Sequence, residues 1–295
     1  MKRSRKIPWL YSAPALFVIG VVVLFPILYT GYISLTNMNL YHWSDYHIIG
    51  LSNYGRALLK LDSGFMSALL TTIIWTALNM VIQVAVAFFI ALGLNTEGLK
   101  LNRVYKTLLM FPWAMPAYIS ILLWKVGIFN TEFGLLNKLL MLLGQDKYNV
   151  LSRNMPAFIA CMVLNLWMAL PFMIMTIDGA LQSIDKSYYE SAQLDGAGFI
   201  KKCIYITIPS LKGIIAPAVI MTTFTTFKQF DIIYLLTMQK GSLSGASLQT
   251  VITYAQQNAF VSNNYGLSSA VSIIIFIIII FFSIYTNKGL REEEN

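Results

Sequence analysis

The chain has 295 residues, of which 57% are hydrophobic and 12% are charged, and its mean hydropathy is +0.65. Soluble globular proteins contain roughly 45–50% apolar and roughly 25% charged residues, so this composition excludes an ordinary soluble domain. The net charge of +8 could indicate nucleic-acid binding in a soluble protein. Here the basic residues flank apolar segments, as the positive-inside rule describes, and we expect a lipid bilayer as partner and no nucleic acid.

Six apolar stretches are long enough to cross a bilayer, which takes about 20 helical residues. They cover about residues 10–35, 68–94, 107–126, 156–181, 214–236 and 267–285. The first follows the basic start MKRSRK, as a signal peptide would, but it exceeds the ~7–15 residues of a signal core and no A-x-A site follows it. We therefore expect an all-α integral membrane protein with six transmembrane helices, forming one membrane domain over residues 1–295.

Lysine and arginine are unevenly distributed between the two sides of such a protein. With the N-terminus in the cytoplasm, the inner segments carry 13 of these residues and the outer segments carry seven, and Lys228 in the fifth stretch completes the 21. This bias predicts that both termini are cytoplasmic and that the loop around Asn149 is outside. The expected location is the cytoplasmic membrane of a bacterium.

Proline marks the third stretch. The sequence FPWAMP at 111–116 places two prolines four residues apart. Because proline lacks the N–H group that a helix needs and clashes with the preceding turn, we expect it to bend the third helix near its inner end. The bend could serve packing or gating.

Few residues offer chemistry of their own. Cys161 lies in an apolar run and Cys203 in a loop expected in the cytoplasm, so no disulfide is expected. His42 and His47 have no cysteine nearby, and we expect no metal site. The chain contains no G-x-x-x-x-G-K-[ST] phosphate loop and no recognisable catalytic constellation, so we do not expect it to be an enzyme.

The segment between the fourth and fifth stretches, about residues 182–213, is too polar to span a membrane. Ser183, Asp185 or Ser187 could cap a helix over about residues 186–194, and Gly196 suits the left-handed turn that ends many helices. A second short helix over about 198–206 would run to Pro209. Two short helices joined by a glycine turn predict a rigid projection suited to docking on a partner.

The same segment resembles the cytoplasmic loop of permeases in binding-protein-dependent ATP-binding-cassette importers, which reads E-A-A-x-x-D-G-A and then I-x-L-P. The matching positions are Glu190, Ala192, Asp195, Gly196, Ala197, Ile206 and Pro209, with Ser191 for Ala, Ile208 for Leu, Cys203 for the usual Phe and Gly213 for a second Pro. The resemblance implies a MetI-like fold in which this coupling loop, including Tyr189, contacts an ATPase. It also implies that ATP and Mg²⁺ are bound by the partner rather than by this chain.

Further stretches resemble the sugar-importing branch of that family, in particular the first of two permeases in importers for maltose, maltodextrin or related oligosaccharides. They are ISLTNMNLY at 33–41, GLSNY at 50–54, FPWAMPAYIS at 111–120, FGLLNKLL at 133–140, NLWMALPFMI at 165–174 and FKQFDIIYLLT at 227–237. The implied partners are a second, homologous permease, two cytoplasmic ATPase subunits and an extracytoplasmic sugar-binding protein.

The resemblance also implies a sugar site between the fourth and fifth helices. The corresponding positions are Asn165, Met168, Ala169, Phe172, Thr222, Thr225, Thr226 and Gln229. Hydroxyl and amide groups beside an aromatic ring suit a neutral sugar, although helix packing through Thr and Ala accounts for these residues equally well. Lys228 and Asp231 are expected on one face of the fifth helix, as part of a functional site or as a structural ion pair.

Three other functions remain open. The same machinery could carry another solute such as glycerol phosphate, but phosphate would favour arginine in the pore, where none is present. A membrane-embedded enzyme would need clustered acidic or histidine residues at one membrane face. An ion-coupled carrier acting alone would not need the cytoplasmic projection.

Overall fold

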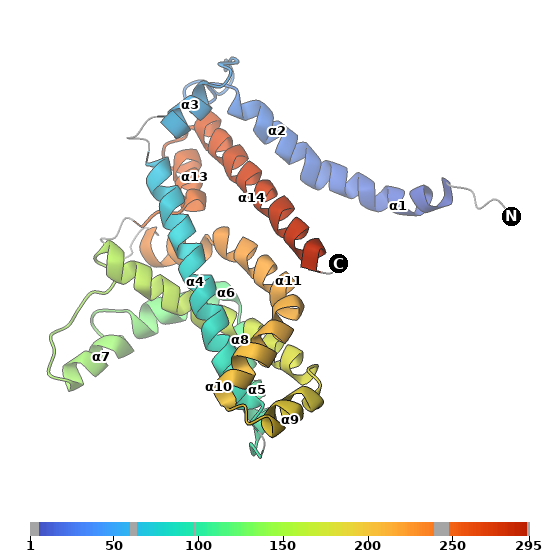
Figure 1. The fold of residues 1–295 in the computed structure, drawn as a ribbon. Helices are drawn as coiled ribbons and strands as arrows, with labels where there is room; N and C mark the ends of the chain where they lie inside the picture. The colour runs from blue at the N-terminus through green and yellow to red at the C-terminus, as the bar shows by residue number, and fades with distance from the viewer. Residues whose placement is uncertain (1–5, 60–63, 97, 239–247, 294–295) are drawn as a thin grey trace. The chain divides into compact units, whose positions relative to one another are not determined.

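The computed structural model describes residues 6–59, 64–96, 98–238 and 248–293. Lys2, Arg3, Arg5, Lys60 and Lys240, which contribute to the charge count, and the last two residues of the tail REEEN lie outside these ranges. The described residues are predominantly helical (Figure 1). They form two compact units, one of residues 6–59, 64–69 and 251–281 and the other of the described residues from 70 to 250 and from 282 to 293.

Five helices are long and apolar enough to cross a membrane, and a sixth span results if one bent pair of helices is counted as one. The five are the continuous run α1, η1 and α2 (Lys6–Ile19, Gly20–Leu24, Phe25–Ser34), α4 (Phe65–Leu94), α8 (Asn154–Gln182), the run from α10 to η5 described below, and α14 (Tyr265–Glu293). The first, second, fourth and sixth expected helices are confirmed, with ends that differ by a few residues.

Backbone contacts around one glycine join the parts of the first unit. Gly266, near the start of α14, donates its N–H to the Met38 carbonyl at 2.9 Å, and a Cβ added there would lie 2.3 Å from the Thr36 carbonyl oxygen. The buried Asn53 of α3 (Ser52–Leu59) donates to the Ser34 and Thr36 carbonyls at 2.8 and 2.7 Å. The other described helix of this unit is α13 (Val251–Phe260).

The third expected span is bent within FPWAMP, as the sequence predicts. It consists of α5 (Asn102–Ala114) and α6 (Ala117–Leu123), which continues into η3 (Trp124–Ile128), and the two arms meet at 94°. The break at Met115 and Pro116 lies in the predicted motif, although it falls midway along the segment and not near one end. Pro116 is the N-cap of α6, because its fixed φ suits a helix start better than a helix interior.

The fifth expected helix is also different. It begins earlier, because α10 (Phe199–Lys202), η4 (Cys203–Thr207) and α11 (Ile208–Phe227) follow one another without a gap. Pro209 lies in the first turn of α11, where a missing N–H costs nothing, so it does not end a separate short helix. The helix then breaks at residues 228–230, and α12 (Asp231–Ile233) and η5 (Tyr234–Met238) follow.

This break corrects the placement of Lys228 and Asp231. Lys228 ends α11, whereas Asp231 begins α12, so the two residues do not share a helix face. The run TTFTTF supplies a physical reason, because the hydroxyls of Thr222, Thr223 and Thr225 bond to carbonyls three or four residues earlier, and such bonds weaken or bend helices. The second unit also contains α7 (Leu135–Leu142), which was not expected.

Candidate functional site: a membrane cavity and a glycine-turned projection

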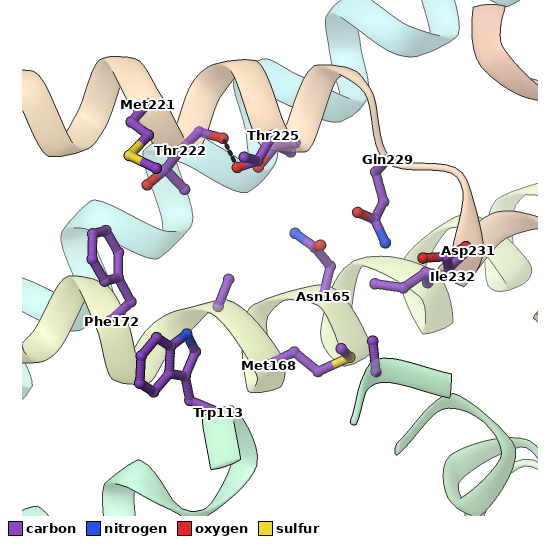
Figure 2. Close-up of a pocket in the computed structure, with 13 residues that line it drawn as sticks. Trp113, Asn165, Met168, Phe172, Met221, Thr222, Thr225, Gln229, Asp231 and Ile232 are labelled. Atoms are coloured by element: carbon purple, nitrogen blue, oxygen red, sulfur yellow. Dashed lines mark hydrogen bonds between the residues drawn. The ribbon is translucent and has the colours of Figure 1, made fainter. Parts of the chain in front are cut away.

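A cavity of 430 Å³ opens between α8, α11 and the bent α5–α6 pair (Figure 2). All of the sugar-site positions predicted from the resemblance line it: Asn165, Met168, Ala169, Phe172, Thr222, Thr225, Thr226 and Gln229. Gln229 does so from the break after α11 and not from the helix itself. The structure thus brings residues from two distant segments around one space, and their role in binding stays a prediction.

Five further residues complete the wall and were not predicted as site residues: Trp113, Ala117, Met221, Asp231 and Ile232. Trp113 and Ala117 lie on the two sides of the bend in FPWAMP. The sequence predicted a bend at this motif but did not indicate that its residues line a cavity. Asp231 was noted as a membrane carboxylate, but its place in the cavity depends on the helix break. The described lining contains one carboxylate and neither Lys nor Arg.

The cavity has an aromatic part and an amide part. Figure 2 shows Trp113 and Phe172 near one another, while Asn165 and Gln229 lie farther along. The Thr222 and Thr225 hydroxyls donate to backbone carbonyls of their own helix at 2.8 and 2.9 Å, so toward a ligand they can act only as acceptors. Such a surface can stack on an apolar ligand face and exchange hydrogen bonds with hydroxyl groups.

The projection predicted between residues 182 and 213 begins with the expected helix, and α9 covers Lys186–Leu194. The Asp185 carboxylate caps it by accepting from the Ser187 backbone N–H at 2.9 Å, and the hydrogen bonds from Ser187 lower the pKa of Asp185. Gly196 has φ of +74°. Ala197 donates to the Ala192 carbonyl at 2.8 Å and Gly196 to that of Gln193 at 3.0 Å, the pattern of a Schellman motif.

Two side-chain contacts hold α9 against the helix that follows. The Tyr189 hydroxyl lies 3.0 Å from the Thr207 hydroxyl, and Lys202 donates to the Gln193 amide oxygen at 3.1 Å. Tyr189 and Glu190 both line a second cavity of 690 Å³ next to the ends of α4 and α8. No described residue forms an ion pair with Glu190, whose carboxylate is exposed.

The tip of the projection carries large apolar side chains that are open to solvent. Leu194 is 90% exposed, and Phe199 and Ile200 on the other side of the glycine turn are each 70% exposed. Exposed apolar groups gathered on a polar segment mark an interaction surface. The described residues contain no group of three potential metal ligands.

These features define a class, a multi-helix membrane protein with a cavity between its helices and a projecting, glycine-turned segment. A family model for the inner membrane component of binding-protein-dependent transport systems matches residues 83–287. The chain therefore belongs to this family, the permeases of ATP-binding-cassette importers, in which a separate subunit hydrolyses ATP.

Individual relatives are similar over almost the whole chain. The trehalose/maltose transport system permease protein MalF of Thermococcus litoralis is 32% identical over 282 residues, which are 96% of this chain and 92% of the relative. The galactooligosaccharides transport system permease protein GanP of Bacillus subtilis is 30% identical over 304 residues, covering 98% and 72%. A bacterial ABC transporter involved in the import of the acidic polysaccharide alginate has the same fold, with a TM-score of 0.79, 19% identity and 96% of each chain covered.

Proposed function

We propose that this chain is one of two homologous permease subunits of an importer for a neutral saccharide. Maltose-type and galactose-containing oligosaccharides are the cargoes to test first. The observation that carries the proposal is the 430 Å³ cavity, whose described wall joins Trp113 and Phe172 to amide and hydroxyl groups and contains no cationic side chain. Permeases named for maltose, maltodextrin and galactooligosaccharides are 29–32% identical to the chain.

Each part of the cavity has a role in this proposal. The aromatic rings stack on the apolar face of a sugar ring, while Asn165 and Gln229 hydrogen-bond with its hydroxyls. The Gln229 amide makes no side-chain hydrogen bond with a described residue, so both its donor and its acceptor are available. Thr222, Thr225 and Thr226 add acceptor oxygens from α11.

The projection from Asp185 to Pro209 is proposed as the contact with the ATPase. Glu190 would meet a basic or donor group at the rim of the ATPase cleft, and Leu194 would enter the cleft as an apolar anchor. Tyr189, Ala192, Asp195, Gly196 and Ala197 give the projection its shape. Two ATPase subunits would bind ATP and Mg²⁺, and an extracytoplasmic binding protein would deliver the saccharide. Both termini and the projection would then lie in the cytoplasm.

Glycerol phosphate is a weaker candidate, because a phosphate group is usually met by Arg or Lys and the described lining has neither. Reconstitution decides between the two cargoes. The full importer in proteoliposomes should show ATP hydrolysis and uptake stimulated by its binding protein with maltose, trehalose, maltotriose or a galactooligosaccharide. Stimulation by glycerol phosphate alone would overturn the saccharide assignment.

A further inference from the structure

Helix α4 buries several polar side chains along its length. Trp75, Asn79 and Gln83 follow one another at intervals of four residues, so they lie on one face of the helix. Each of the three is 0% exposed, and none of them lines the cavity. Polar groups buried in a membrane helix are costly and are retained where they serve a function.

Each of these residues hydrogen-bonds to a residue that does line the cavity. Trp75 donates its indole N–H to the Thr226 carbonyl at 3.2 Å. Asn79 accepts from the Asn165 amide at 2.8 Å, and Gln83 donates to the Ala169 carbonyl at 3.0 Å. One helix face therefore supports both α8 and the C-terminal end of α11.

The three contacts reach different parts of the cavity wall. Thr226 lies in the last turn of α11, and its carbonyl accepts from the Gln229 backbone N–H at 3.2 Å as well as from Trp75. Gln83 bonds to the Ala169 carbonyl, two residues before Pro171, which leaves the Trp167 carbonyl of α8 without its usual donor. Asn79 fixes the amide of Asn165, which lines the cavity.

Gln83 also carries a feature that stability does not explain. Its amide oxygen is buried and has no hydrogen-bond partner among the described residues. A buried unsatisfied acceptor is destabilising, so a methionine of similar shape would be the more stable choice at this position. Retaining glutamine is consistent with a role for its donor group, which holds the Ala169 carbonyl.

We propose that Trp75, Asn79 and Gln83 are positioning residues for the cargo cavity, which set the spacing between α8 and the end of α11 and thereby the discrimination among saccharides. The assignment rests on the proposed function of the cavity, although the positioning itself can be measured without a saccharide.

The saccharide-independent measurement uses a cysteine reporter in the cavity wall. Ala169→Cys is introduced into the full importer complex, with Cys203 replaced by Ser, and its rate of labelling by a membrane-impermeant maleimide is measured. Gln83→Met and Asn79→Leu should each change that rate by about threefold or more. Thr76→Val is the matched control, because Thr76 is buried in the same helix and bonds to its own helix at the Thr72 carbonyl.

The saccharide-dependent measurement is the ratio of uptake rates for maltose and a galactooligosaccharide at saturating binding protein. Gln83→Met should alter this ratio by about threefold or more, with an assembled complex of unchanged elution and no loss of thermal stability. The assignment would be overturned if the labelling rate were the same in all variants, or if Thr76→Val changed it as much as the other substitutions do. It would also be overturned if both uptake rates fell in proportion. If the wild-type importer moves no saccharide, the proposed function fails, and the labelling result still decides whether α4 positions the wall.

Discussion

The Lys106 ammonium lies 2.7 Å from the Asp178 carboxylate, joining α5 to α8. Asp178 is 8% exposed and also accepts from Asn95 at 2.8 Å and from Gln182 at 3.0 Å. Because the buried Asp178 carboxylate of α8 accepts hydrogen bonds from α5 and from Asn95 just after α4, it connects these three parts of the fold. The position of Asp178 within the fourth span gave no indication of its partner, since Lys106 lies 72 residues earlier.

Removing one member of this pair should destabilise the assembled importer. Lys106→Met leaves a buried charge without its counter-ion, which costs about 3 kcal/mol or more, and the complex should unfold at a lower temperature. Lys106→Met with Asp178→Asn should recover most of the loss. Lys147→Met is the control, because its bridge to Glu132 is exposed and should contribute at most about 1 kcal/mol. Equal effects of the two lysine substitutions would contradict a structural role for Asp178.

The orientation in the membrane can be tested with one cysteine on each side. Lys147→Cys and Lys201→Cys, each on a background without Cys203, should be labelled by an impermeant maleimide from opposite sides of sealed vesicles. The reason is the charge bias of the loops. If both react from the same side, the six-span orientation is wrong.

Glu190 should act through its charge on the ATPase and not through the fold of the projection. Its carboxylate is exposed and has no ion-pair partner among the described residues, so Glu190→Ala should barely change the stability of the subunit. Copurification of the ATPase, or the coupling of hydrolysis to transport, should fall. Glu190→Gln keeps the shape and should show the same defect. Full activity of both variants would remove the support for this contact.

Gly196 should matter for backbone shape alone. Its φ of +74° disfavours any side chain, while a Cβ there would meet no atom within 4 Å, so Gly196→Ala should destabilise the turn by about 1 kcal/mol and reduce ATPase retention. Gly196→Val should impair assembly more. Gly198→Ala is the matched control, because Gly198 has an ordinary φ of −71° and equal space. A larger defect from the control would show that the left-handed turn is not what matters.

Gln229 should contribute directly to cargo recognition. Gln229→Leu removes an unpaired amide from the cavity wall and strands a saccharide hydroxyl, which costs about 1–3 kcal/mol, so uptake should fall while assembly is retained. The measurement is saccharide uptake by the reconstituted importer. Thr223→Val is the control, since Thr223 lies on α11 but does not line the cavity. Unchanged uptake in Gln229→Leu would exclude this residue from the site.

The sequence by itself determined the first, second, fourth and sixth spans, the family, and the first helix and glycine turn of the projection. These depend on local properties: the length of apolar runs, the capping Asp185, and a glycine at the one position where α9 needs a left-handed residue. Such features are encoded within about ten residues of the chain, and the observed α9 has the predicted bounds. The eight residues that the resemblance named for a sugar site all line one cavity, and their role in binding a sugar stays a prediction.

Tertiary structure decided the rest, because it depends on partners that are distant in the chain. The break after Phe227 has no glycine or proline to announce it, and the Thr226 carbonyl at that end is held by Trp75, 151 residues earlier. Trp113 joins the cavity only because the α5–α6 pair bends by 94°. Asn79 and Gln83 look like isolated polar residues in an apolar helix until α8 packs against them, and that packing decides which of their hydrogen bonds can form.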